Sequence, residues 1–120
     1  MHGPPVHILL AADDPRVREG VVALLREHGF VVLVAEDGDA ALSLLVAHEV
    51  DLLPTDVAMP GINGFETAQQ AKSMRPSLRL LCMTGYAEGA GDKGSLYGKV
   101  IQKPFGAGQL LAEISQALAG

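Results

Sequence analysis

The feature of this sequence that most constrains its fold is an alternation of short apolar runs with helical patterns along 120 residues. The apolar runs have the length of single strands, and they are Val6–Ala12, Phe30–Ala35, Asp51–Thr55, Leu78–Met83 and Val100–Gln102. Such an order of elements predicts a parallel sheet with helices on both faces. Because crossovers between parallel strands are right-handed, few arrangements of five strands remain.

Two segments differ sharply in how clearly the sequence predicts a helix. The segment after residue 105 has its apolar residues at helical spacing, which makes it the clearest amphipathic helix of the chain. The segment from Gly85 to Gly98 contains five glycines. We expect a short and mobile helix there, because each interior glycine costs about 1 kcal/mol relative to alanine.

Composition and charge exclude several classes of protein. Apolar residues make up 48% of the chain, which suffices for one core, and no apolar run approaches the roughly 18 residues of a membrane-spanning helix. A net charge of −5 argues against binding to nucleic acid. The single cysteine, Cys82, excludes an internal disulfide and a cysteine-clustered zinc site. We expect one domain over residues 1–120, with residues 1–5 as a disordered tail, in the cytoplasm.

Polar side chains follow four of the apolar runs. Asp13 and Asp14 follow the first run, Asp56 the third, Thr84 the fourth and Lys103 the fifth. In such sheets ligands bind beyond the carboxyl ends of the strands. Crowded carboxylates favour a divalent cation, and Mg²⁺ suits them because it accepts one or two carboxylates and keeps its waters. A lysine and a hydroxyl beside a carboxylate nucleophile are what a transferred phosphoryl group needs.

Three segments resemble the receiver domains of bacterial two-component response regulators: DLLPTDVAMPGING at residues 51–64, MTGYA at residues 83–87 and KPF at residues 103–105. The resemblance runs from about His7 to the last helical segment, and the Asp-x-x-Met-Pro-Gly-x-x-Gly stretch is specific. It implies an α/β, flavodoxin-like (βα)5 fold. Its five-stranded parallel sheet would be doubly wound, with strand order 2-1-3-4-5.

The resemblance also implies a role for each candidate residue. Asp56 would be the phosphoacceptor, Thr84 the switch hydroxyl and Lys103 the phosphate-binding lysine. The implied Mg²⁺ ligands are Asp13, Asp56 and the backbone carbonyl of Ala58, with Asp14 as a further candidate. The Lys103–Pro104 peptide bond would be cis, which only a bond to proline adopts at low cost.

Three residues depart from the family pattern. Ala12 stands where the family usually has the first of two acids, and this predicts weak Mg²⁺ binding. Pro54 lies inside the expected central strand, where it cannot donate to the ladder, so we expect a missing bond on one side only, with a local distortion or a water there. Val100 stands at the usual aromatic switch position, three residues before the lysine.

These residues predict a phosphorylation-controlled signalling switch. A sensor histidine kinase or a phosphotransfer protein would donate a phosphoryl group to Asp56 with Mg²⁺. A downstream protein would dock on the face of the fourth helix, fifth strand and fifth helix. We expect no direct nucleic-acid or membrane partner and no turnover of a separate substrate. The TGYA and glycine-rich segments look closest to receivers attached to sensor histidine kinases.

Three alternatives remain. The first is a degenerate receiver that acts as a phosphorylation-independent interaction module, which Ala12, Pro54 and Val100 favour. The second is a small phosphatase or phosphotransferase with an aspartyl nucleophile, although that class usually has a second acid two residues later, where this chain has Ala58. The third is a flavin-binding domain, although no hydroxyl- or glycine-rich phosphate loop follows the first strand.

Overall fold

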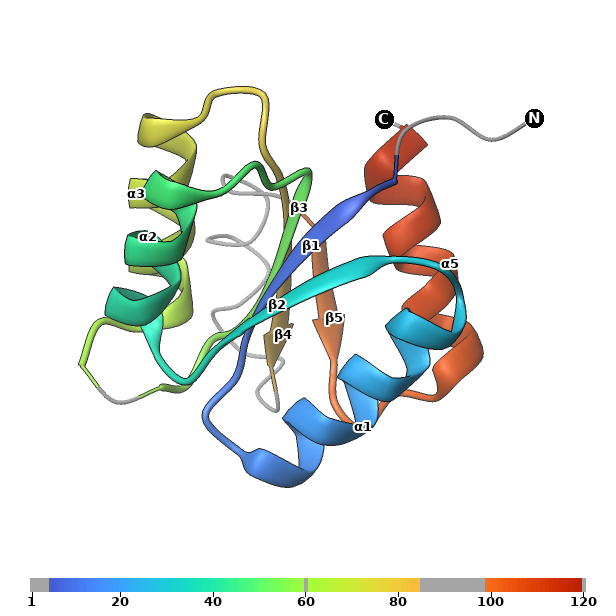
Figure 1. Ribbon diagram of the computed structural model, residues 1–120. Coiled ribbons are helices and arrows are strands. Elements are labelled where there is room, and N and C mark those ends of the chain that lie inside the picture. The colour runs from blue at the N-terminus through green and yellow to red at the C-terminus, as the bar shows by residue number, and fades with distance from the viewer. Residues whose placement is uncertain (1–4, 60, 85–98, 120) are drawn as a thin grey trace.

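The computed structural model describes residues 5–59, 61–84 and 99–119 (Figure 1). Five strands form one parallel sheet in the order β2-β1-β3-β4-β5. The strands are β1 (His7–Ala11), β2 (Val31–Ala35), β3 (Leu52–Asp56), β4 (Arg79–Thr84) and β5 (Lys99–Gln102). The structure therefore confirms the predicted sheet and its strand order. The expected short helix at residues 85–98, and residues 1–4 of the expected tail, lie outside the described residues.

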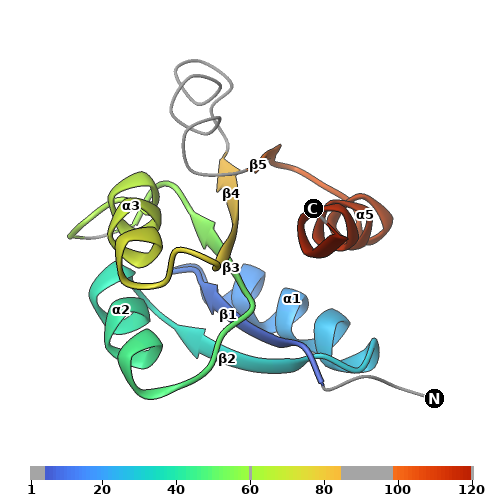
Figure 2. The ribbon, with the colours of Figure 1, turned by 90° about the horizontal axis from the view of Figure 1, so that it is seen from above.

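Four helices cover the two faces of the sheet, as Figures 1 and 2 show. Helices α1 (Pro15–Glu27) and α5 (Ala107–Ala119) pack on one face, and α2 (Gly38–Ala47) and α3 (Gly64–Met74) pack on the other. Successive strand residues point to opposite faces, so each strand supplies both cores. In β1, Leu10 packs under α1 and α5, whereas its neighbour Leu9 packs under α2 and α3.

Polar side chains fix where the helices begin. The Asp14 carboxylate accepts a hydrogen bond from the Arg16 backbone N–H at 2.9 Å, and Pro15 occupies the first turn of α1. Asp37 and Asn63 cap α2 and α3 in the same way. These caps end the loops that follow β1, β2 and β3 at the carboxyl side of the sheet.

Pro54 lies in the central strand and interrupts pairing on one side only. Strand β3 pairs continuously with β4 from Leu52 to Asp56. On the β1 side, pairing occurs at Leu52 and Thr55 but not between them. The register places the Pro54 nitrogen opposite the Leu9 carbonyl. Both missing pairs would need a hydrogen bond between these two atoms, and the proline nitrogen carries no hydrogen to donate. The expected one-sided gap is confirmed.

Cys82 on β4 is fully buried in the core under α2 and α3. Burial raises the pKa of its thiol to about 11. It is therefore a packing residue. Within the part of the chain that the structure describes, no helix is long and apolar enough to cross a lipid bilayer.

Candidate functional site

The carboxyl ends of β1, β3, β4 and β5 bring the predicted site residues to one edge of the sheet, the lower edge in Figure 1. Asp56 and Thr84 are the last residues of β3 and β4, rather than the first residues after them as the sequence suggested. Both are buried, with 1% and 3% of their surface exposed. Their position inside regular strands makes the site more rigid than a loop would.

Lys103 reaches Asp56 from the end of β5. Its Nζ contacts Oδ1 of Asp56 in an ion pair. The backbone N–H of Lys103 donates to the Thr84 carbonyl at 2.6 Å, and the Lys103–Pro104 peptide bond is cis, as expected. The lysine is thus anchored to the end of β4 while its side chain lies against the nucleophile candidate on β3.

The Asp56 carboxylate is held in an unusual electrostatic environment. Burial raises the pKa of this carboxyl above its ordinary value, Lys103 opposes the shift, and the charges of Asp13 and Asp14 add to it. The second oxygen, Oδ2, is buried and has no hydrogen-bond partner among the residues that the structure describes. Since buried polar atoms are nearly always paired, an open carboxylate oxygen points to a ligand.

The start of α3 packs closely against the backbone of Asp56. A Cβ atom on Gly64 would lie 2.0 Å from the Asp56 carbonyl oxygen, so only glycine allows this approach. The Gly64 N–H donates to the Val57 carbonyl at 2.8 Å, and the Thr55 hydroxyl donates to the Asp56 carbonyl at 3.1 Å. Another glycine, Gly61, turns the intervening loop with a φ of +75°.

The loop after β1 presents the two other carboxylates. Asp13 and Asp14 are both exposed, and Asp14 uses Oδ1 to cap α1. Ala12 is fully buried. Sequence reasoning missed Arg18, whose guanidinium donates to the carbonyls of Ala12 and Asp13 at 2.9 and 3.2 Å. No pattern in the sequence pointed to this contact, because it depends on how α1 leaves the sheet.

The donors at this edge fit a hard divalent cation. Asp56 offers a buried open oxygen, and Asp13 and Asp14 add negative charge. Ala58 follows in an exposed part of the loop. No cluster of three or more His, Cys, Asp or Glu side chains suited to a metal occurs among the residues placed in the structure. A metal here would therefore depend on two carboxylates, a backbone carbonyl and water.

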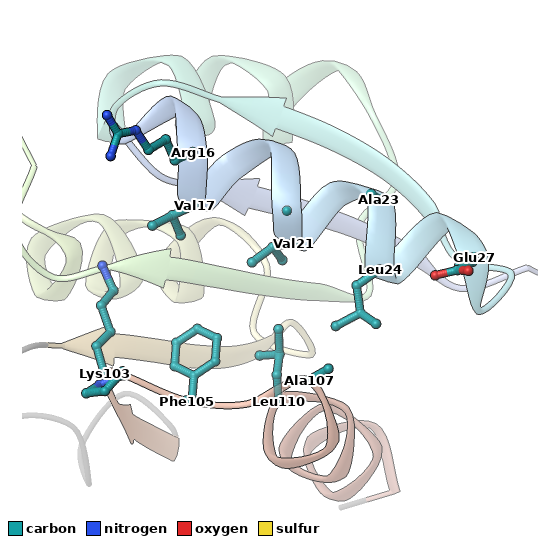
Figure 3. A pocket seen from close by; sticks show the side chains of 12 residues that line it. Arg16, Val17, Val21, Ala23, Leu24, Glu27, Lys103, Phe105, Ala107 and Leu110 are labelled. Atoms are coloured by element: carbon teal, nitrogen blue, oxygen red, sulfur yellow. The ribbon is translucent and has the colours of Figure 1, made fainter.

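A groove of about 630 Å³ opens beside Lys103, between α1 and the start of α5 (Figure 3). Its walls are apolar, with Val17, Val21 and Leu24 on one side and Phe105 and Leu110 on the other. Lys103 lines the groove, whereas Asp56 is not among its lining residues. Val100 at the expected switch position is half-buried and packs against the core under α2 and α3.

Residues 8–115 match the family described as response regulator receiver domain. This chain belongs to that family. The receiver domain is 35% identical over 114 residues to the response regulator receiver protein CpdR of Brucella abortus, covering 92% of this chain and 95% of CpdR. It is 33% identical to the response regulator MprA of Mycolicibacterium vanbaalenii, but it spans only about half of MprA, 51% of its length.

Solved structures agree with this assignment of the receiver domain. The response regulator TrrA of Thermotoga maritima, in complex with Mg²⁺-BeF, has a TM-score of 0.87 and 27% identity, covering 94% of this chain and 99% of TrrA. The receiver domain of the hybrid histidine kinase CckA has a TM-score of 0.80 and 31% identity, covering 93% and 98%. The family resemblance read from the sequence is therefore confirmed, and the roles of individual site residues stay predictions.

Proposed function

We propose that this receiver domain is a phosphorylation-controlled signalling switch in which Asp56 accepts the phosphoryl group. The observation that carries the proposal is the state of the Asp56 carboxylate, which is buried, paired with Lys103 at Oδ1 and open at Oδ2 within the described residues. A carboxylate with one oxygen held and the other open is arranged as a nucleophile. The Lys103 ammonium would neutralise charge on the incoming phosphoryl oxygens.

The donor we propose is a phosphohistidine of a sensor histidine kinase or of a phosphotransfer protein. An Asp56 carboxylate oxygen attacks phosphorus, the phosphorus–nitrogen bond breaks, and its electron pair goes to the imidazole nitrogen. Water later attacks the acyl phosphate, which restores the carboxylate and releases inorganic phosphate. Both steps occur on the chain itself, so we expect no turnover of a separate substrate. The similarity to the receiver of the hybrid histidine kinase CckA supports this kind of donor.

We propose that Asp13, Asp56 and the Ala58 carbonyl bind Mg²⁺. The Mg²⁺-BeF complex of the similar protein TrrA supports this choice of ion. When bound, Mg²⁺ would neutralise charge on the transferred phosphoryl group. Binding would be weak, because buried Ala12 supplies no carboxylate to orient the waters of the ion. Asp14 would compensate only in part, since its Oδ1 caps α1.

Thr84 would couple phosphorylation to a partner protein. Its hydroxyl, at the buried end of β4, would donate to a phosphoryl oxygen and so shift the segment that follows. We propose that a downstream protein docks on the face of the fourth helix, β5 and α5, of which β5 and α5 are described. A net charge of −5 fits a cytoplasmic protein partner rather than nucleic acid or a membrane surface.

Labelling with acetyl phosphate or beryllofluoride at high Mg²⁺ tests the proposal. We expect Asp56→Asn to abolish labelling and to leave the circular dichroism spectrum unchanged. Asp51→Asn is the matched control, because Asp51 is an exposed acid just before the other end of β3 and should label like the parent chain. Undiminished labelling of Asp56→Asn would overturn the assignment of the phosphoacceptor.

A second candidate is an interaction module that works without phosphorylation. The specific observation that favours it is the methyl group of Ala12, fully buried where a carboxylate would support a metal. The same experiment separates the two functions. A parent chain that takes up neither acetyl phosphate nor beryllofluoride at saturating Mg²⁺ would favour the interaction module.

A further inference from the structure

We infer that Arg18 is a positioning residue that holds the loop carrying Asp13 in the geometry needed to bind a divalent cation. This inference rests on the proposed function of the same site. Arg18 lies in the first turns of α1, and one guanidinium nitrogen, Nη1, donates to the carbonyls of both Ala12 and Asp13. Its backbone N–H donates to the Asp14 carbonyl at 2.9 Å. One residue therefore binds the three successive carbonyls of the loop between β1 and α1.

This arrangement matters because, among the described residues, few other hydrogen bonds hold the loop. The Ala12 N–H donates to the Ala35 carbonyl at 3.1 Å, which fixes where β1 ends. Beyond that point Asp13 and Asp14 are exposed, and Asp14 faces the start of α1 as its cap. We therefore assign to Arg18 the orientation of the Asp13 side chain toward Asp56.

Removing Arg18 has opposite expected effects on Mg²⁺ affinity, depending on whether its charge or its hydrogen bonds matter more. A guanidinium close to a cation site repels the cation, so deleting it should tighten Mg²⁺ binding if repulsion dominates. Loss of a group that orients a ligand should weaken binding, by about 10- to 100-fold for contacts that support a metal ligand. The direction of the change therefore distinguishes positioning from electrostatics.

Arg16 provides a matched control on the same helix. It lies two residues away and carries the same charge, but its guanidinium donates no hydrogen bond to any residue placed in the structure. Arg16 is exposed, and Figure 3 shows it among the residues that line the groove between α1 and α5. Arg16→Met thus removes one positive charge near the site and leaves the loop carbonyls in place.

The experiment is a Mg²⁺ titration of the full chain by isothermal calorimetry, at low salt and at 0.5 M salt, where charge effects are largely screened. We expect Arg18→Met to weaken Mg²⁺ binding about tenfold at both salt concentrations. We expect Arg16→Met to bind like the parent at high salt. Arg18→Lys should recover most of the affinity, since one ammonium can donate to both carbonyls.

Equal or tighter Mg²⁺ binding by Arg18→Met would overturn the inference. If that variant does not fold, Arg18→Gln takes its place with the same outcomes, because its amide is too short to bridge the loop. Labelling of Asp56 is measured separately on each protein. A labelled parent with unchanged Mg²⁺ affinity in the variant defeats only this inference, whereas an unlabelled parent with reduced affinity in the variant defeats only the proposed function.

Discussion

Two buried titratable residues on neighbouring strands show how residue-scale environment sets chemistry. Cys82 on β4 and Asp56 on β3 are both almost fully buried, and burial raises the pKa of each. Cys82 is buried in the core under α2 and α3, so its thiol stays neutral and serves as packing. Asp56 faces the ammonium of Lys103 and keeps one oxygen open within the described site. The two buried groups therefore differ in their surroundings, because Asp56 has a charged partner at the carboxyl edge of the sheet and Cys82 lies within the core.

The raised pKa of Asp56 predicts how stability depends on pH. Because the folded pKa lies above the ordinary value of 3.8, ionised Asp56 lowers the free energy of unfolding, and this penalty grows as pH rises from 3.8 through the folded pKa. We expect Asp56→Asn to be more stable than the parent chain at pH 7 in Mg²⁺-free buffer. The difference should shrink with acidification and vanish below about pH 3.8.

Urea denaturation at a series of pH values measures this difference between variant and parent. The comparison cancels the other carboxylates, which both proteins share. A parent chain more stable than Asp56→Asn at neutral pH would mean that attraction to Lys103 outweighs burial at this site.

At the scale of elements, the central strand β3 lacks part of its pairing with β1 and is approached closely by the backbone of α3. Pro54 breaks the pairing of β3 with β1 two residues before the site, while pairing with β4 stays continuous. At Gly64, the backbone of α3 packs against the Asp56 carbonyl. The position of Asp56 is therefore held by β4 and α3, and the pairing with β1 resumes only at Thr55, directly before it.

Restoring the missing ladder bond should stabilise the chain. Pro54→Val supplies an N–H opposite the Leu9 carbonyl and a side chain that suits a buried strand. The bond contributes about 1 kcal/mol, and loss of proline's restriction of the unfolded chain removes about 0.5 kcal/mol of that gain. We expect a higher urea midpoint with an unchanged denaturant slope.

Pro76→Ala is the control for this prediction. Pro76 is exposed in the turn after α3, outside the sheet, so its replacement changes mainly the unfolded chain. We expect a small loss of stability there. If Pro54→Val and Pro76→Ala lower the free energy of unfolding equally, the missing hydrogen bond beside Pro54 does not affect stability.

At the scale of the whole molecule, the site is built from residues far apart in sequence. Asp13, Asp56, Thr84 and Lys103 come from four strand ends and meet only when the sheet is complete. A ligand that binds them therefore binds only the folded chain, and its affinity appears as stability. Binding and folding can be measured in one experiment.

This linkage tests the role of Ala12. Position 12 is fully buried, so Ala12→Asp should lower stability without metal, because a buried carboxylate is costly. If the new acid orients waters of the ion, Mg²⁺ affinity should rise about tenfold. The Mg²⁺-induced gain in the free energy of unfolding at saturating Mg²⁺ should then exceed that of the parent by about 1.4 kcal/mol.

Urea denaturation with and without Mg²⁺ measures both effects, and Ala12→Asn is the uncharged control of matching shape. We expect the control to respond to Mg²⁺ like the parent. An equal Mg²⁺ response in Ala12→Asp and the parent would show that Ala12 is not the weak point and that Asp14 already compensates.

The sequence by itself determined the sheet, its order and the residues at its edge. The apolar runs and the short loops between elements are local properties, right-handed crossovers leave few topologies, and the family resemblance selects the strand order among them. The motif around Asp56 and the Lys103-Pro104-Phe105 segment identified the family, which the comparisons confirm. Even the one-sided gap at Pro54 follows from the missing N–H of a single residue.

Only the tertiary structure decided which atoms meet. The ion pair that leaves one oxygen of Asp56 open, the α3 backbone against its carbonyl and the Arg18 contacts with the loop after β1 all join separate elements. These contacts depend on the distance and angle at which helices leave the sheet. Side-chain packing in two cores sets those quantities, and no local pattern encodes them.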